Sequence, residues 1–94
     1  MRIENVEVFS DATNAVVLRH PGRAFPGLLV QGDTLFSMWQ LADEACADSK
    51  TTSSNDSHAV LSELRDKLGA LLSHYTSTLR EHGLPLPFFD GAGA

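Results

Sequence analysis

The chain has 94 residues, 43% hydrophobic and 20% charged, a composition typical of one small globular domain with no room for a catalytic cleft between two lobes. Seven Lys and Arg against twelve Asp and Glu give a net charge of −5, which argues against a nucleic-acid or anionic-membrane surface and favours a basic partner. Cys46 is the only cysteine, so an intramolecular disulfide is excluded. No segment is typical of a signal peptide or a membrane span, so we expect a cytoplasmic protein.

Three short segments in the first third of the chain have the composition of β-strands. Strand-forming residues occupy 6–9 and 15–20, and Leu28 to Val30 form a third apolar run. Turn-forming residues separate these segments at 11–14 and at Pro21-Gly22. Because such short connections cannot make the crossovers that parallel strands require, the sequence predicts a three-stranded antiparallel sheet.

The segment 25–34 predicts a corner from strand to helix. Pro26 fixes φ and Gly27 tolerates positive φ, so this pair predicts a turn into the third strand. Gly32 is expected to end that strand in a tight turn. Asp33 is placed to accept hydrogen bonds from the first free N–H groups of a helix, as an N-cap. We interpret Gly27, Gly32 and Asp33 as structural residues of this corner.

Two helices are predicted after the corner. Apolar residues recur three or four positions apart over 33–47, and again over 57–82. Between them, the polar segment 48–56 predicts a mobile surface loop. Gly83 can adopt the left-handed conformation that ends a helix, and the prolines after it leave a short tail over 84–94. The expected fold class is therefore α+β, in the order β-β-β-α-α, as a single domain over residues 1–94.

The apolar faces of these elements predict a core between the helices and one face of the sheet. Gly69 lies inside the second helix, where glycine costs about 1 kcal/mol relative to alanine. Either it is tolerated, or it allows close approach of another backbone from the same chain or from a second copy. This helix and the unpaired sheet edges predict a homodimer. The predicted core residues are Val8, Val17, Leu29, Leu35, Trp39, Leu64, Leu68, Leu71 and Tyr75.

No set of residues predicts catalysis, a cofactor or a metal site. The four histidines form no i, i+4 pair and a single cysteine supplies no thiolate set, so zinc binding is not expected. The chain has neither a nucleophile elbow nor a glycine-rich phosphate loop. Asp43 and Glu44 point about 100° apart on a helix, so they are interpreted as a solvated edge rather than an acid/base pair. We expect that the protein is not an enzyme.

A cationic loop is the one candidate binding site. Arg19 and Arg23 flank a Pro-Gly turn and could bind a phosphate or a carboxylate. Alternatively, the loop is a solvated turn whose charges balance acids such as Glu7 and Asp11. Phe25 could be an aromatic anchor for a partner, or it could pack under the adjacent turn.

The order of these motifs resembles the core of HicB-type antitoxins. The resemblance covers roughly 15–87 and rests on Phe25-Pro26-Gly27, on Gln31-Gly32-Asp33-Thr34, and on the helix end Gly83-Leu84-Pro85-Leu86-Pro87. It implies a small sheet covered by helix, with a partial ribonuclease-H-like layout and no working nuclease site. HicB-type proteins usually add a fourth strand and a DNA-binding module. After Pro87 there is room for two or three strand residues at most and for no such module, so DNA repression is not expected.

Two function classes follow. The resemblance and the acidity predict a protein that binds another protein, as an antitoxin-like or immunity-type inhibitor of a basic toxin, with Arg19, Arg23 and Phe25 as contact residues. The alternative is a small anion-binding protein or enzyme that uses Arg19, Arg23 and Asp33.

Overall fold

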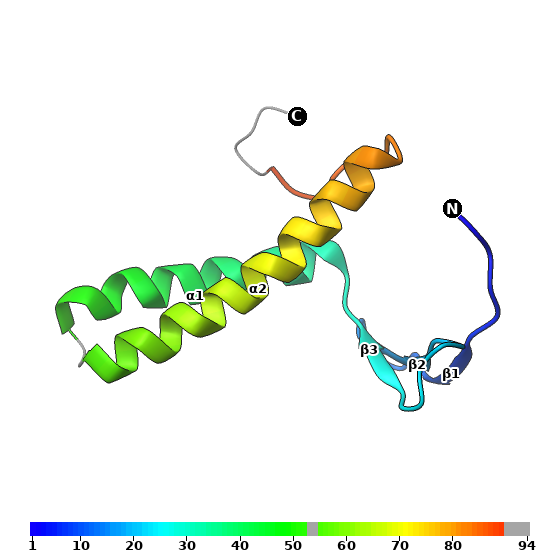
Figure 1. Ribbon diagram of the computed structural model, residues 1–94, viewed down its shortest axis with the longest axis horizontal. Coiled ribbons are helices and arrows are strands. Elements are labelled where there is room, and N and C mark those ends of the chain that lie inside the picture. Colours follow the sequence, from blue (N-terminus) through cyan, green and yellow to red (C-terminus); the bar gives the residue numbers. More distant parts are fainter. Residues whose placement is uncertain (53–54, 90–94) are drawn as a thin grey trace. The chain divides into compact units, whose positions relative to one another are not determined.

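The computed structural model describes residues 1–52 and 55–89 and has an α+β architecture (Figure 1). Three strands, β1 (Glu7–Ser10), β2 (Val16–Arg19) and β3 (Gly27–Leu29), precede two helices, α1 (Gly32–Thr52) and α2 (Asn55–Glu81). The predicted fold class and element order are confirmed. The chain divides into two compact units, Met1–Gln31 and Gly32–Ala94, here called the sheet unit and the hairpin unit. That the two units form one domain stays a prediction.

The sheet unit is an antiparallel meander in the order β1-β2-β3, as predicted. Val8 pairs with Leu18, and the register shifts between Val8 and Ser10, where the strand is irregular. Val16 pairs with Leu29 in the second ladder. Local hydrogen bonds form the turns. In the first turn, the Thr13 hydroxyl accepts from the backbone N–H of Ala15 at 3.2 Å. The strands are therefore joined by turn residues that the sequence identified.

The hairpin unit consists of α1 and α2 lying side by side and antiparallel (Figure 1). On α1, the residues that face α2 recur at spacings of three and four, and the small residues Ala42, Cys46 and Ser49 are buried there. Trp39 lies against Gly69 of α2, and its Nε1 would be 3.3 Å from a Cβ added to that glycine. Gly69 therefore allows a close helix crossing within the chain. Of the two partners that the sequence left open, the same chain and a second copy, the structure shows the first.

Four aromatic rings cluster at the end of the hairpin where α1 begins and α2 ends. Phe88 stacks on Phe36 with ring centroids 4.4 Å apart and an interplanar angle of 4°. Tyr75 and Trp39 contact this stack in tilted arrangements, at centroid distances of 6.4 Å from Phe88 and 6.1 Å from Phe36, respectively. No strand follows Pro87 in the part of the tail that is described. The tail instead returns Phe88 to the start of α1.

The C-terminus of α2 is capped as the sequence predicts. Gly83 has φ of 67°. Its N–H donates to the carbonyl of Arg80 at 3.1 Å, and the N–H of Leu84 donates to the carbonyl of Leu79 at 2.9 Å. This is the hydrogen-bond pattern of a Schellman motif, in which a left-handed glycine turns the chain out of the helix.

Replacing Gly83 tests this cap. Because the left-handed conformation places a Cβ too close to the following carbonyl oxygen, we expect Gly83→Ala to lower the free energy of unfolding by about 1–2 kcal/mol. Gly27→Ala is the matched control, since Gly27 lacks positive φ and an added Cβ meets nothing within 4 Å. Urea denaturation measures both. Equal midpoints for the two variants would contradict the proposed strain at Gly83.

The predicted loop over 48–56 is wrong for the residues that are described. Residues 48–52 continue α1, and Asn55 begins α2. The physical reason is Ser49, which is buried and donates to the carbonyl of Cys46 at 2.7 Å. Its hydroxyl is also 2.7 Å from Nδ1 of His58 on α2. These polar residues join the two helices rather than forming a loop, whereas residues 53 and 54 lie outside the described residues.

None of the predicted core residues is fully buried inside its own unit, and their burial between the two units stays a prediction. Those that are half-buried are Val17, Leu35, Trp39, Leu68 and Tyr75, and those that are exposed are Val8, Leu29, Leu64 and Leu71. The helices approach closely enough at Trp39 and Gly69 that small side chains fill the seam, which leaves the leucines beside it. Packing of the helices against the sheet stays a prediction, since the positions of the two units relative to each other are not determined.

Candidate functional site

Arg19 forms an ion pair with Glu7 across the sheet. Its Nε donates to Oε1 of Glu7 at 2.9 Å, and Nη2 lies 2.5 Å from the same oxygen. The two residues are register partners on β1 and β2, so opposite charges face each other on one side of the sheet. The guanidinium also lies 5.8 Å from the ring centroid of Phe9. For Arg19, the alternative of a solvated charge balanced by Glu7 is the one that the structure supports.

Arg23 differs from Arg19 in its surroundings. Its backbone N–H donates to the carbonyl of His20 at 2.9 Å and closes the turn between β2 and β3. The same turn is held by His20, whose Nδ1 accepts from the N–H of Gly22 at 3.1 Å. The Arg23 guanidinium makes no hydrogen bond or ion pair with the described residues. The two arginines therefore do not act as a pair, and Arg23 is the one that is available to a ligand.

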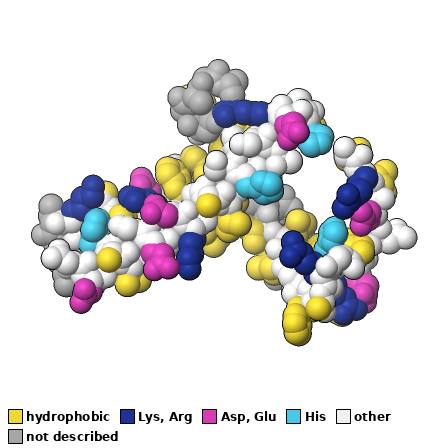
Figure 2. Space-filling view, viewed as in Figure 1, with side chains coloured by type: hydrophobic (Ala, Val, Ile, Leu, Met, Phe, Trp, Pro, Cys, Tyr) yellow, Lys and Arg dark blue, Asp and Glu magenta, His cyan; other side chains and the backbone are white. Residues whose placement is uncertain are grey.

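A shallow apolar groove lies beside this turn, with a volume of approximately 420 Å³. It follows β3, an edge strand that is hydrogen-bonded within the sheet unit to β2. The Phe25 side chain is 83% exposed at this groove, so it does not pack under the Pro26-Gly27 turn. Figure 2 shows apolar side chains open to solvent on the sheet unit. The groove is lined by Leu18, His20, Arg23, Ala24, Phe25, Gly27, Leu28 and Leu29.

The predicted structural corner is correct in location and wrong in part of its detail. Gly27 starts β3 without positive φ, so a turn conformation is not the reason for glycine there. Gly32 begins α1 rather than ending a strand in a tight turn; it is buried, and an added Cβ would lie 2.5 Å from Cε1 of Tyr75. The prediction of Asp33 as the N-cap is wrong, because Asp33 lies inside the first turn of α1, where its Oδ1 accepts from the N–H of the adjacent Thr34 at 2.9 Å. Gly32 thus provides space for the Tyr75 ring.

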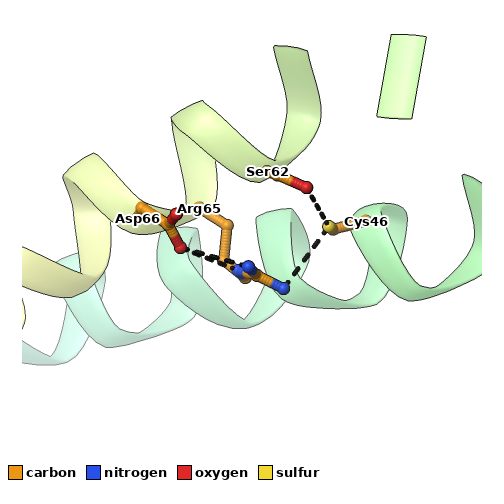
Figure 3. A network of polar contacts seen from close by, with 4 residues as sticks. All are labelled: Cys46, Ser62, Arg65 and Asp66. Atoms are coloured by element: carbon orange, nitrogen blue, oxygen red, sulfur yellow. Dashed lines mark hydrogen bonds and ion pairs between the residues drawn. The ribbon is translucent and has the colours of Figure 1, made fainter. Parts of the chain in front are cut away.

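A polar network joins the helices at the middle of the hairpin (Figure 3). The Cys46 thiol, with 0% exposure, is 3.2 Å from the Ser62 hydroxyl and accepts from Nη1 of Arg65 at 3.4 Å. Arg65 also pairs with Asp66 at 3.1 Å. The hydrogen bond to Asp66 and the charge interactions with Cys46 and Asp66 raise the pKa of Arg65 above its usual range. Because the thiol has no solvent access, this network holds helices together and offers no reactive group.

The sheet, the groove and the hairpin through Phe88 all fall within one family match. A protein family described as a family of unknown function, DUF6959, matches residues 1–88. The chain belongs to DUF6959. No curated protein and no solved structure matches it. The resemblance to HicB-type antitoxins stays a prediction for this DUF6959 chain.

Among the described residues of this DUF6959 chain, no group of three or more His, Cys, Asp or Glu could hold a metal ion. Within the same ranges, no helix combines the length and apolar character needed to cross a membrane. Sequence reasoning missed the contacts of Ser49, Ser62 and Arg65 across the hairpin. Ser62 and Arg65 belong to a second row on α2, which follows the leucines by one position and was concealed by its polar composition.

Proposed function

We propose that this DUF6959 chain is a non-enzymatic protein-binding module that holds a partner polypeptide in the groove beside β3. The observation that carries the proposal is Phe25, a large apolar side chain exposed at an apolar groove. Aromatic side chains that anchor in a partner often contribute most of the binding free energy. Leu28 lies in the same groove and is also exposed, which extends the apolar contact along the strand.

The backbone of β3 supplies the second part of the proposed contact. Since β3 pairs with β2 along one edge within the sheet unit, its other edge can accept an extended segment by strand addition. Main-chain hydrogen bonds would then give affinity, and the groove would select an apolar side chain of the partner. Arg23, at the end of the groove, would donate to a carbonyl or carboxylate oxygen of that segment.

The finer proposal is an antitoxin-like or immunity-type inhibitor that neutralises a basic toxin in the cytoplasm. Residues 1–31 contain three Lys or Arg and three Asp or Glu, whereas residues 32–94 contain four and nine. The net charge therefore arises from the part of the sequence that forms the hairpin unit, which would attract a cationic partner over long range while the groove supplies the specific contact. The resemblance to HicB-type antitoxins supports the same proposal.

The anion-binding or enzymatic alternative is less favoured. It requires Arg19, Arg23 and Asp33 to act together, but Arg19 is paired with Glu7 and Asp33 accepts a hydrogen bond from the start of its own helix. No acid/base pair accompanies Arg23 in the groove lining.

The test is affinity capture of the partner from the native host, followed by rescue of growth from its toxicity. Phe25→Ser should weaken the affinity by roughly 30-fold, which corresponds to a hot-spot loss of about 2 kcal/mol. Phe89→Ser is the matched control, because Phe89 is 78% exposed and is not part of the groove lining. Affinity for the basic partner should also fall with salt, mainly through the association rate, since screening acts over about 10 Å at 0.1 M.

Two results would contradict the proposal. In the first, Phe25→Ser and Phe89→Ser bind the captured partner equally well, which removes the groove from the interface. In the second, the purified protein turns over a substrate, or binds a small anion at Arg23 with no polypeptide partner, and the alternative function replaces this one.

A further inference from the structure

The hairpin unit has an apolar face that its own two helices leave open. Met38, Leu41 and Ala45 of α1 are exposed, as are Leu64 and Leu71 of α2. Leu41 is 65% exposed and Leu71 is 59% exposed, although each lies in the middle of a long helix. These side chains are too large and too numerous on two adjoining helices to be isolated surface residues.

The exposed apolar residues occupy equivalent positions on the two helices. On α1, Met38, Leu41 and Ala45 each precede by one position a residue of the seam with α2, namely Trp39, Ala42 and Cys46. The same holds on α2, where Leu64 precedes Arg65, which contacts Cys46, and Leu68 precedes Gly69, which contacts Trp39.

This equivalence places both rows on one side of the hairpin. One position back along a helix is a rotation of about 100°. Because the helices face each other and run in opposite directions, the same rotation leads to the same side on both. The following positions, such as Gln40 on α1 and Ala70 on α2, point away from this side. The hairpin therefore has one apolar face and one polar face.

We propose that this face is the interface of a homodimer, in which two hairpins pack into a four-helix bundle. On α2, Leu61, Leu64, Leu68 and Leu71 are spaced three, four and three apart, the repeat that lets a leucine row pack into an identical row by knobs-into-holes contacts. A face formed by two antiparallel helices is also self-complementary under twofold symmetry. The α2 row is formed by leucines alone, and the acidic Asp48, which precedes Ser49 by one position, lies at the end of the α1 row, beyond Ala45.

The size of the face agrees with a dimer. Helix α1 has 21 residues, which corresponds to roughly 31 Å, and two packed helices are roughly 20 Å wide, so contact along the whole length of α1 covers about 600 Å² on each copy. Two copies then bury about 1,200 Å² together, which is within the range of specific, stable interfaces. The sequence left open a crossing at Gly69 within the chain or between copies; Gly69 lies against Trp39 of the same chain, so the leucine row is the proposed contact between copies.

The test is the mass of the full chain in solution, measured by light scattering at micromolar concentrations, with paired variants. The unmodified chain and Ala70→Glu should have twice the 10.2 kDa mass of one chain. Leu71→Glu should have the single mass, with dissociation at least about a hundredfold more favourable because a charge is buried in an apolar interface. Circular dichroism verifies that each variant retains its helices.

A second pair of variants, on α1, tests the dimer interface if Leu71→Glu does not fold. Leu41→Glu should be monomeric, and Gln40→Glu, which introduces the same charge on an exposed neighbouring position, should remain dimeric. An unmodified chain that is monomeric at all these concentrations would overturn the proposal. So would dimers of unchanged mass and affinity in folded Leu71→Glu or Leu41→Glu.

Discussion

Trp39→Ala is expected to lower the free energy of unfolding by about 2–3 kcal/mol, less than the roughly 3–5 kcal/mol typical of a fully buried tryptophan. The indole is half-buried, and it contacts both Gly69 across the seam and Phe36 on its own helix. Its removal leaves a gap beside a glycine, which has no side chain to fill it. Because Trp39 is the only tryptophan, urea denaturation of this variant is followed by circular dichroism.

The neighbouring surface position supplies the control for Trp39→Ala. Gln40→Ala, at an exposed position, should change stability by less than about 0.5 kcal/mol. A second check uses Gly69→Ala, whose added Cβ would lie 3.3 Å from the indole Nε1. Alanine stabilises a helix by up to about 1 kcal/mol relative to glycine. The net stabilisation by Gly69→Ala should be larger in the Trp39→Ala background, because the added Cβ then meets no indole. A Trp39→Ala midpoint equal to that of Gln40→Ala would mean that the seam does not depend on the indole.

Gly32→Ala is expected to lower the free energy of unfolding by about 1–3 kcal/mol, the range for an extra methyl group in a filled space. The added Cβ would overlap Cζ and Oη of Tyr75 and would lie 2.5 Å from its Cε1. Movement of the ring away from the added methyl group would disturb its contact with Phe88 in the aromatic cluster. Fluorescence of Trp39 during urea denaturation reports the change.

A double-mutant cycle separates this clash from an effect on the backbone. In a Tyr75→Ala background the added methyl group has no ring to meet, so Gly32→Ala should then be neutral or slightly stabilising by helix propensity. The interaction energy between the two sites should therefore be at least about 1 kcal/mol. Equal costs of Gly32→Ala in both backgrounds would show that the glycine serves the backbone at the start of α1 and not the ring.

The sheet and the helix ends could be predicted from the sequence because local chemistry determines them. The Pro21-Gly22 turn and the Gly83 cap depend on a few adjacent residues, and both formed where they were predicted. The extent of α1 depends instead on a contact across the hairpin, between Ser49 and His58. A polar segment read alone predicts a loop, and no local pattern shows that its serine has a partner on the next helix.

In the core and the candidate site, too, the features that the sequence did not predict depend on contacts between residues far apart in the chain. Leu64 and Leu68 fit an amphipathic helix, but the seam lies one position further along, at Arg65 and Gly69. Periodicity gives the width of an apolar face and does not show which of its edges meets the other helix. At the site, an exposed Phe25 and a buried one were equally compatible with the sequence, and the pairing of Arg19 with Glu7 required the sheet register.

The two ends of the hairpin differ in the side chains that become exposed to water when the helices separate. At one end, parting α1 from α2 would expose aromatic rings to water, at Phe36 and Tyr75 among others. At the other, it would release the hydroxyl of Ser49 and the ring of His58, which water can satisfy as well as they satisfy each other. Transient openings should therefore begin at the polar end, and amide hydrogens there should exchange with solvent before those beside the rings. Because α1 ends at Thr52 and α2 begins at Asn55, such an opening would be a local unfolding of the two joined helix ends and not a separation of whole helices.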